Sequence, residues 1–85
     1  MISKKTKLKA KKCEDYWKVQ YKKRGFKIGK MNLGGDFTAT KGRDKRIVEV
    51  KFCGGLLSPV QKITKQIAPK VGIKFDLKRC GCDRF

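Results

Sequence analysis

The alternation of apolar and polar residues along this chain predicts a small α/β domain. Near the start, apolar residues recur at spacings of three and four, as on the inward face of a helix. They are Ala10, Cys13, Trp17 and Tyr21. We expect this helix over residues 7–24, ending at Gly25, because glycine favours the left-handed turn that follows a helix.

Strand-like alternation then appears in four segments. Residues 26–30, 36–40, 46–53 and 73–78 each place apolar residues at every second position, as in a half-buried strand. A polar segment with one glycine, residues 41–44, joins the second and third segments and has the length of a common hairpin loop.

A second helix is predicted between the last two strands. Ser58 is a suitable N-cap, Pro59 fits the first helical position, and Gln61 completes a capping box. The apolar residues of this helix are expected on its inner face, and Pro69 and Gly72 end it by about residues 68–71. They are Val60, Ile63 and Ile67.

The order of elements is therefore α-β-β-β-α-β, which predicts a mixed four-stranded sheet flanked by two helices. A strand, a helix and a second strand in that order also favour a right-handed crossover. The chain of 85 residues has room for one domain. We assign residues 7–79 to it, with a flexible basic tail at 1–6 and a short tail at 80–85.

The predicted hairpin brings two acidic residues together. If the loop closes symmetrically, Thr38 faces Ile47 and Asp36 faces Glu49, with Cβ atoms roughly 4.5–5.5 Å apart. Carboxylates at that distance repel each other unless a cation bridges them or one is protonated. Mg²⁺, which binds one or two carboxylates together with water and phosphate oxygens, would resolve the conflict.

Two further charged residues belong to this hypothesis. Lys51 lies two residues beyond Glu49 on the same strand face, about 7 Å along it, where it could orient a water or neutralise a phosphate. Glu14 lies beside the apolar stripe of the first helix. Each has an ordinary alternative: Lys51 a surface ion pair with Glu49, and Glu14 an i,i+4 pair with Lys18.

Composition points to a polyanionic partner. The formal net charge is +17, with 24 basic and 7 acidic residues, and such a charge favours nucleic acid over an anionic membrane. No apolar run approaches the ~20 residues that span a bilayer, and the start lacks the apolar core of a signal peptide. We therefore expect a cytoplasmic protein with reduced thiols.

The basic residues predicted to hold the phosphates of a duplex lie on the first helix, at the hairpin tip and on the second helix. They are Lys9, Lys11, Lys12, Lys41, Arg43, Lys45, Arg46, Lys62 and Lys65, together with Lys4, Lys5 and Lys7. Binding through them should weaken steeply with salt. Because nothing indicates readout of bases, recognition of DNA shape at junctions, flaps or nicks is expected.

The order and spacing of these residues resemble the PD-(D/E)XK nuclease superfamily, whose core is that of restriction endonucleases. Asp36, the run Glu49-Val50-Lys51 and a glutamate on the first helix carry the resemblance. The segment from Val48 to Gly55, followed by residues 57–61, is similar to the virus-type replication-repair nuclease (VRR-NUC) domain. The spacing from Asp36 to Glu49 and the helical glutamate also resemble archaeal Holliday-junction resolvases.

The resemblance implies metal-dependent hydrolysis of DNA phosphodiesters. Asp36 and Glu49 would bind Mg²⁺ or Mn²⁺, with the backbone carbonyl of Val50 as a further ligand. Lys51 would position the attacking water, and Glu14 would act directly or through a metal-bound water.

Two features of the resemblance bear on single residues. Gln61 matches the glutamine on the second helix of the family, which implies that it would steady the site, while the capping box explains it equally well. Gly35 stands where the proline that gives the family its name precedes the aspartate.

The four cysteines leave several alternatives open. Cys13 and Cys53 fall on predicted core elements and are expected to be buried as small apolar side chains. Cys80 and Cys82 could bind a metal, although a single Cys-x-Cys without histidine is a weak zinc signal. A Cys80–Cys82 disulfide or an intermolecular bridge would need an oxidising or hyperthermophilic setting.

The competing function is that of a non-catalytic basic DNA- or RNA-binding protein. It explains the charge equally well, but gives no reason for Asp36 to oppose Glu49. For the nuclease we expect a homodimer, since a chain with one site needs two copies to cut both strands.

Overall fold

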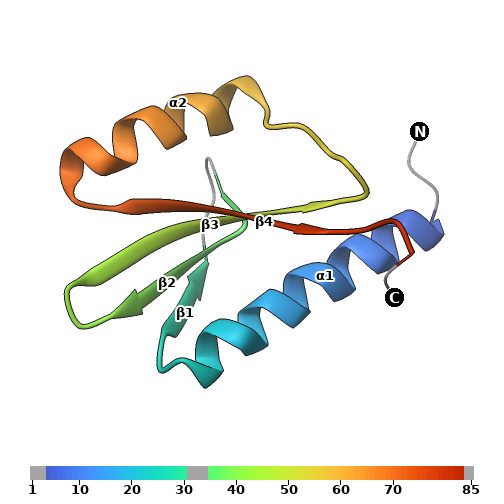
Figure 1. Ribbon diagram of the computed structural model, residues 1–85, viewed down its shortest axis with the longest axis horizontal. Helices are drawn as coiled ribbons and strands as arrows, with labels where there is room; N and C mark the ends of the chain where they lie inside the picture. Colours follow the sequence, from blue (N-terminus) through green and yellow to red (C-terminus); the bar gives the residue numbers. More distant parts are fainter. Residues whose placement is uncertain (1–3, 31–34, 84–85) are drawn as a thin grey trace.

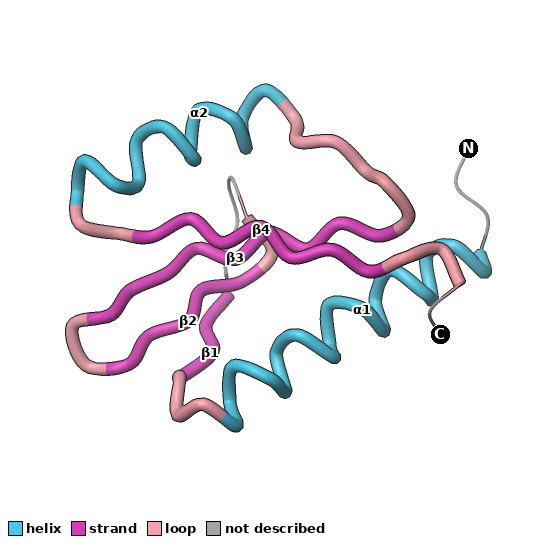
Figure 2. The backbone as a smooth tube through the Cα atoms, viewed as in Figure 1, coloured by secondary structure: helices cyan, strands magenta, loops and turns pink. Residues whose placement is uncertain are grey.

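The order of helices and strands confirms the predicted fold class. The computed structural model describes residues 4–30 and 35–83. Its elements are α1 (Lys4–Lys23), β1 (Lys27–Lys30), β2 (Phe37–Lys41), β3 (Asp44–Phe52), α2 (Pro59–Ile67), the 3₁₀ turn η1 (Ala68–Val71) and β4 (Lys74–Cys80). This is the α-β-β-β-α-β order, with boundaries that differ from the predicted ones by a few residues (Figures 1 and 2).

The four strands form one mixed sheet in the order β1-β2-β3-β4. β2 pairs antiparallel with β1 and with β3, whereas β4 is parallel to β3. The helices lie on opposite sides of this sheet, α1 below it and α2 above it in the view of Figure 1. The parallel pair places α2 in the crossover between β3 and β4.

α1 begins earlier than predicted and ends where glycine allows it to turn. Its first residue is Lys4, so the expected tail over residues 1–6 is helical from there on. At the other end Gly25 has φ 90°. The amide of Gly25 donates to the carbonyl of Lys22 (3.0 Å) and that of Phe26 to Tyr21 (3.0 Å), as in a Schellman motif.

The hairpin closes in the predicted register. Thr38 pairs with Ile47 and Thr40 with Lys45. The loop is tight because Gly42, at φ 60°, adopts a backbone conformation that other residues rarely take. β3 therefore presents alternate residues to the two helical layers, as period-2 geometry requires.

The core lies between α1 and the sheet. Its buried cluster is Tyr21, Phe26, Phe37, Ala39 and Val48, with Trp17, Ile28 and Val50 packed against it. The ring of Tyr21 meets Phe26 and Phe37 edge-on, with centroids 5.5 and 5.8 Å apart. Such edge-to-face pairs contribute roughly 0.5–1.5 kcal/mol beyond simple burial.

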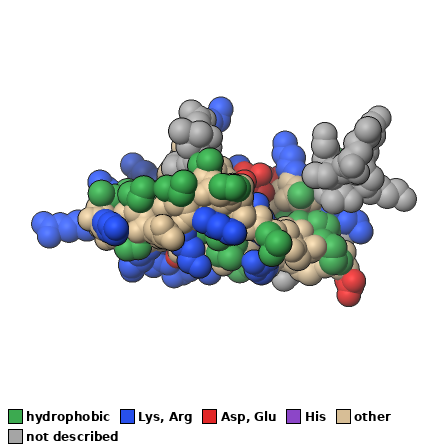
Figure 3. Space-filling model, turned by 90° about the horizontal axis from the view of Figure 1, so that it is seen from above, with side chains coloured by type: hydrophobic (Ala, Val, Ile, Leu, Met, Phe, Trp, Pro, Cys, Tyr) green, Lys and Arg blue, Asp and Glu red, His purple; other side chains and the backbone are tan. Residues whose placement is uncertain are grey.

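The prediction that α2 buries an apolar inner face is wrong. Val60, Ile63 and Ile67 are 51%, 55% and 50% exposed, and none of the described residues of α2 is buried. The crossover is instead anchored just after α2, where Ala68 is 3% exposed. An open apolar groove remains between this corner and the sheet, and hydrophobic side chains lie at the surface on this side (Figure 3).

The cysteines are paired, contrary to the expectation of free thiols. Cys13 is bonded to Cys80, and Cys53 to Cys82. The predicted tail at 80–85 therefore begins with a strand residue, since Cys80 is the last residue of β4 and is buried. Cys13 is buried as expected, whereas Cys53 is exposed.

In the part of the chain that is described, no helix is long and apolar enough to cross a membrane.

Candidate metal site

Asp36 and Glu49 face each other where β2 begins. The amide of Asp36 donates to the carbonyl of Val48 (2.9 Å), which extends the pairing of Phe37 with Val48 by one residue. The next opposed pair in that register is Asp36 with Glu49. The hairpin geometry expected from the sequence is thus present at the site.

Glu49 is a buried carboxylate with an unused oxygen. The residue is 2% exposed, and among the described residues its Oε2 atom has no hydrogen-bond partner. Burial, and secondly the negative charge of Asp36, raises the pKa of Glu49 above its usual value, while Lys51 acts in the opposite direction. Leaving a buried polar atom unpaired costs about 1–3 kcal/mol, so this oxygen marks a place where a cation would be stabilised.

Lys51 is paired with Glu49, which was the ordinary alternative to a role at a metal site. Its Nζ lies 3.2 Å from Oε1 of Glu49, and its side chain is 19% exposed. The ordinary ion pair considered for these two residues is therefore present. It occupies one oxygen of Glu49 and leaves the other, Oε2, unpaired.

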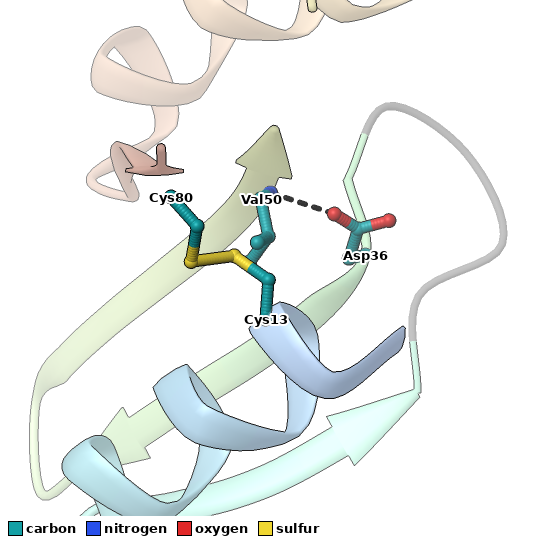
Figure 4. Close-up of a disulfide and its surroundings, with 4 residues drawn as sticks. All are labelled: Cys13, Asp36, Val50 and Cys80. Atoms are coloured by element: carbon teal, nitrogen blue, oxygen red, sulfur yellow. Dashed lines mark hydrogen bonds between the residues drawn. A yellow bond between two sulfur atoms is a disulfide. The ribbon is translucent and has the colours of Figure 1, made fainter. Parts of the chain in front are cut away.

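Asp36 is held at the site by the backbone of β3. Its Oδ2 accepts a hydrogen bond of 2.6 Å from the amide of Val50, drawn as the dashed line in Figure 4. The atom of Val50 that contacts Asp36 is thus the amide nitrogen. The proposed ligand role of the Val50 carbonyl stays a prediction.

Glu14 reaches the same region from α1. It lines an open cavity of about 420 Å³ together with Asp36, Val50 and four further residues of α1. Those four are Ala10, Lys11, Asp15 and Lys18. Lys18 also pairs with Glu14 at 3.4 Å, so the ion pair expected from the i,i+4 spacing is present within the cavity.

The acidic residues form a pair and not a closed cage. No group of three or more histidine, cysteine, aspartate or glutamate side chains within residues 4–30 and 35–83 is placed to hold a metal. Two carboxylates with an unpaired buried oxygen nevertheless fit Mg²⁺, which typically keeps several waters and takes one or two protein carboxylates. Glu14 lies on the wall of the cavity and could complete the set by moving or through a water.

Gln61 is engaged away from the carboxylates. Its side-chain Oε1 accepts from the backbone amide of Ser58 (2.8 Å), and its backbone amide donates to Oγ of Ser58 (3.2 Å). The capping box is confirmed, while a role of Gln61 at the site stays a prediction. Of the two glycines before Asp36, Gly34 lies outside the described residues.

Two of the residues predicted to hold DNA have other partners. Arg46 binds Asp44 through two nitrogens (3.0 Å each) and Asp76 through a third (3.0 Å), so it serves the fold and is not a free phosphate ligand. Lys41 donates to the carbonyl of Arg24 (2.8 Å). Lys41 remains exposed, but this hydrogen bond reduces its freedom to bind a phosphate.

The other predicted phosphate ligands lie at the surface. Lys9 is half-buried, whereas Lys11, Lys12, Arg43, Lys45, Lys62 and Lys65 are exposed. The side chains of residues 4–7 lie outside what is described. Seen from the side of α2, basic side chains project around much of the outline, and acidic atoms form only small patches (Figure 3).

Sequence patterns did not reveal the polar network beneath α1. Asp76 on β4 accepts a hydrogen bond from the hydroxyl of Tyr21 (2.5 Å) and pairs with Arg46 (3.0 Å). Burial and the bond to Asp76 raise the pKa of Tyr21, and the hydrogen bond to Arg46 lowers the pKa of Asp44. The sequence contained one signal for this network. The alternation along β4 put Asp76 on the face of the strand that its apolar neighbours do not share.

Comparisons with protein-family models, with curated proteins and with solved structures found no match for this chain. The resemblance to PD-(D/E)XK nucleases therefore rests on the residues themselves.

Proposed function

We propose that this protein is a Mg²⁺- or Mn²⁺-dependent deoxyribonuclease whose site is built on Asp36 and Glu49. The observation that carries the proposal is the buried, unpaired Oε2 of Glu49 beside the carboxylate of Asp36. A cation bridging the two would remove both the repulsion and the cost of the unpaired oxygen. Among the described residues, Lys51 contacts the other oxygen of this carboxylate, and Oε2 has no hydrogen-bond partner.

The residues around the pair suit hydrolysis of a phosphodiester. A bound divalent ion would polarise the phosphate and lower the pKa of a water that attacks it. The ammonium of Lys51 contacts Glu49, and in this proposal it would hold that water or neutralise charge on the phosphate. The amide of Val50 fixes the orientation of Asp36, and Glu14 reaches the cavity from α1.

The exposed lysines and arginines support a nucleic-acid substrate. Their contacts would be to phosphates, which position a duplex without reading its sequence. We therefore propose a structure-selective enzyme that acts at junctions, flaps or nicks. Because each chain has one such site, cutting both strands at one place would take two copies.

The second candidate is a basic DNA- or RNA-binding protein without catalysis, and the ion pair of Glu49 with Lys51 favours it. That pair already sets a positive charge against the negative charge of the buried carboxylate. In such a protein the two acids would serve only local structure. Neutralising them would then leave nucleic-acid binding unchanged, and Mg²⁺ would have no effect.

The decisive experiment is a cleavage panel. Plasmid, linear duplex, flap and four-way junction are incubated with Mg²⁺, Mn²⁺ or chelator, using wild type, Asp36→Asn and Glu49→Gln. Asp83→Asn is the matched control, since Asp83 is an exposed acid near the C-terminal end. We expect metal-dependent cutting by wild type and the control, and its loss in the other two. Tight binding without cutting, insensitive to metal, would leave the non-catalytic function.

A further inference from the structure

Among the described side chains of α1 that precede Trp17, the main attachment to the sheet is one covalent bond. Among the described residues of α1, only Cys13 and Tyr21 are buried. The aromatic contacts and the hydrogen bond of Tyr21 to Asp76 all belong to the C-terminal half of the helix. Before Cys13, Lys9 and Ala10 are only partly buried, and Leu8 is 61% exposed.

Cys13 provides the missing attachment. Its disulfide to Cys80 joins α1 to the end of β4, where the bridge is shielded from solvent because the two residues are 0% and 4% exposed. Figure 4 shows this bridge beside Val50, whose amide holds Asp36. The crosslink therefore lies next to the candidate metal site.

Glu14 directly follows Cys13 in the chain. Its side chain lines the same cavity as Asp36 and Val50, and its one described ion pair is to Lys18 on its own helix. No described bond from Glu14 itself reaches the sheet. The distance of Glu14 from Asp36 consequently depends on what fixes its neighbour Cys13.

We propose that the Cys13–Cys80 disulfide positions Glu14 at the metal site, so that the site is sensitive to thiol redox state. The inference rests on the proposed function. A dithiol reductant would open the bridge: its two thiols become a disulfide, and their two electrons and two protons convert the bridge to two cysteine thiols. The turn of α1 that carries Cys13 and Glu14 is then no longer tied to β4, so Glu14 moves relative to Asp36 and metal affinity falls.

The second disulfide supplies a matched control. Cys53–Cys82 also closes a long loop, but its residues are exposed and neither neighbours Glu14. Neither of its cysteines belongs to α1, so breaking it removes no covalent link between α1 and the sheet. Both double variants should lose stability, while loss of metal affinity should follow Cys13–Cys80 alone.

The test is a calorimetric titration with Mn²⁺ at 10 °C, with folding verified by circular dichroism. Wild type, the Cys13→Ala/Cys80→Ala pair and the Cys53→Ala/Cys82→Ala pair are compared. Removing groups that position metal ligands typically weakens metal affinity about 10- to 100-fold. We expect a loss of that size for the Cys13/Cys80 pair, and less than about threefold for the other pair.

Combining the cysteine variants with Glu14→Gln shows whether the disulfide acts by positioning Glu14 or by loosening the whole fold. Glu14→Gln is combined with the Cys13/Cys80 pair, and we expect the pair to add no further loss of Mn²⁺ affinity once Glu14 is neutral. DNA affinity without metal should stay unchanged in the two cysteine double variants, because they leave the surface charge unaltered. A full additional loss in the Glu14→Gln background would overturn the proposal.

Each of the other possible results also tests either this inference or the proposed function. Equal Mn²⁺ affinity in wild type and the Cys13/Cys80 pair overturns the inference and leaves the metal site standing. Absence of Mn²⁺ binding by the oxidised wild type refutes the proposed function first. Should the pair be unfolded at 10 °C, both pairs are measured in trimethylamine N-oxide, which favours compact states; failure to fold there also overturns the inference.

Discussion

Removing the buried disulfide should cost this protein a large part of its stability. Cys13 and Cys80 are separated by 67 residues. The chain-entropy relation for a loop of that size gives about 4.4 kcal/mol at 25 °C. Cys53 and Cys82 are separated by 29 residues, for which the same relation gives about 3.6 kcal/mol.

These losses are large compared with the total free energy of unfolding of a small domain. A domain of 85 residues is expected to have a free energy of unfolding of about 4–13 kcal/mol. The Cys13→Ala/Cys80→Ala variant also removes two buried sulfur atoms, which adds a packing loss to the entropic one. It should thus be the more damaging of the two double variants.

Urea unfolding under non-reducing conditions measures the difference, with circular dichroism and the fluorescence of Trp17 as probes. Peptide mapping of the unreduced wild type first establishes the two pairings. We expect a loss of about 4 kcal/mol or more for the Cys13/Cys80 pair, visible as a low midpoint or a missing folded baseline. A loss below about 1 kcal/mol, or a greater loss for the exposed bridge, would refute the reasoning.

Three further outcomes are expected. Because the folded-state pKa of Glu49 is raised, its contribution to stability is full in acid and is lost as pH rises through that pKa. Glu49→Gln should therefore flatten the pH dependence of the melting temperature above pH 4. An unchanged profile would contradict this. Tyr21→Phe should lower the free energy of unfolding by about 1–2 kcal/mol by removing the hydrogen bond to Asp76, and an effect near zero in urea unfolding would show that the bond contributes nothing. Neutralising exposed Arg43 and Lys45 should reduce the slope of log affinity for DNA against log salt by about 2, whereas an unchanged slope would place the duplex elsewhere.

Local sequence signals were sufficient for the hairpin and the helix cap. The tight loop at Gly42 and the alternation of β3 together determine which residues face each other, so the opposition of Asp36 and Glu49 followed from counting. The capping box of Ser58 and Gln61 is equally local. In each case the deciding contact lies within a few residues or one strand pair.

Long-range contacts were the ones missed. Four cysteines allow three pairings, and the observed one depends on how α1 and β4 meet in space. The amphipathic pattern of α2 indicated a buried face, but pattern does not show how closely a helix approaches its sheet. Arg46 resembled any other surface cation, since its carboxylate on β4 is 30 residues away in sequence.

The role of the Asp36–Glu49 pair can be tested most directly by locating manganese. Crystals grown with Mn²⁺ are measured above the manganese absorption edge, for wild type and for Glu49→Gln. The account predicts an anomalous peak in contact with carboxylate oxygens of Asp36 and Glu49 in wild type, and its loss in the variant. No peak there at millimolar Mn²⁺, with Lys51 still paired to Glu49, would contradict it and favour a protein that binds nucleic acid without cutting it.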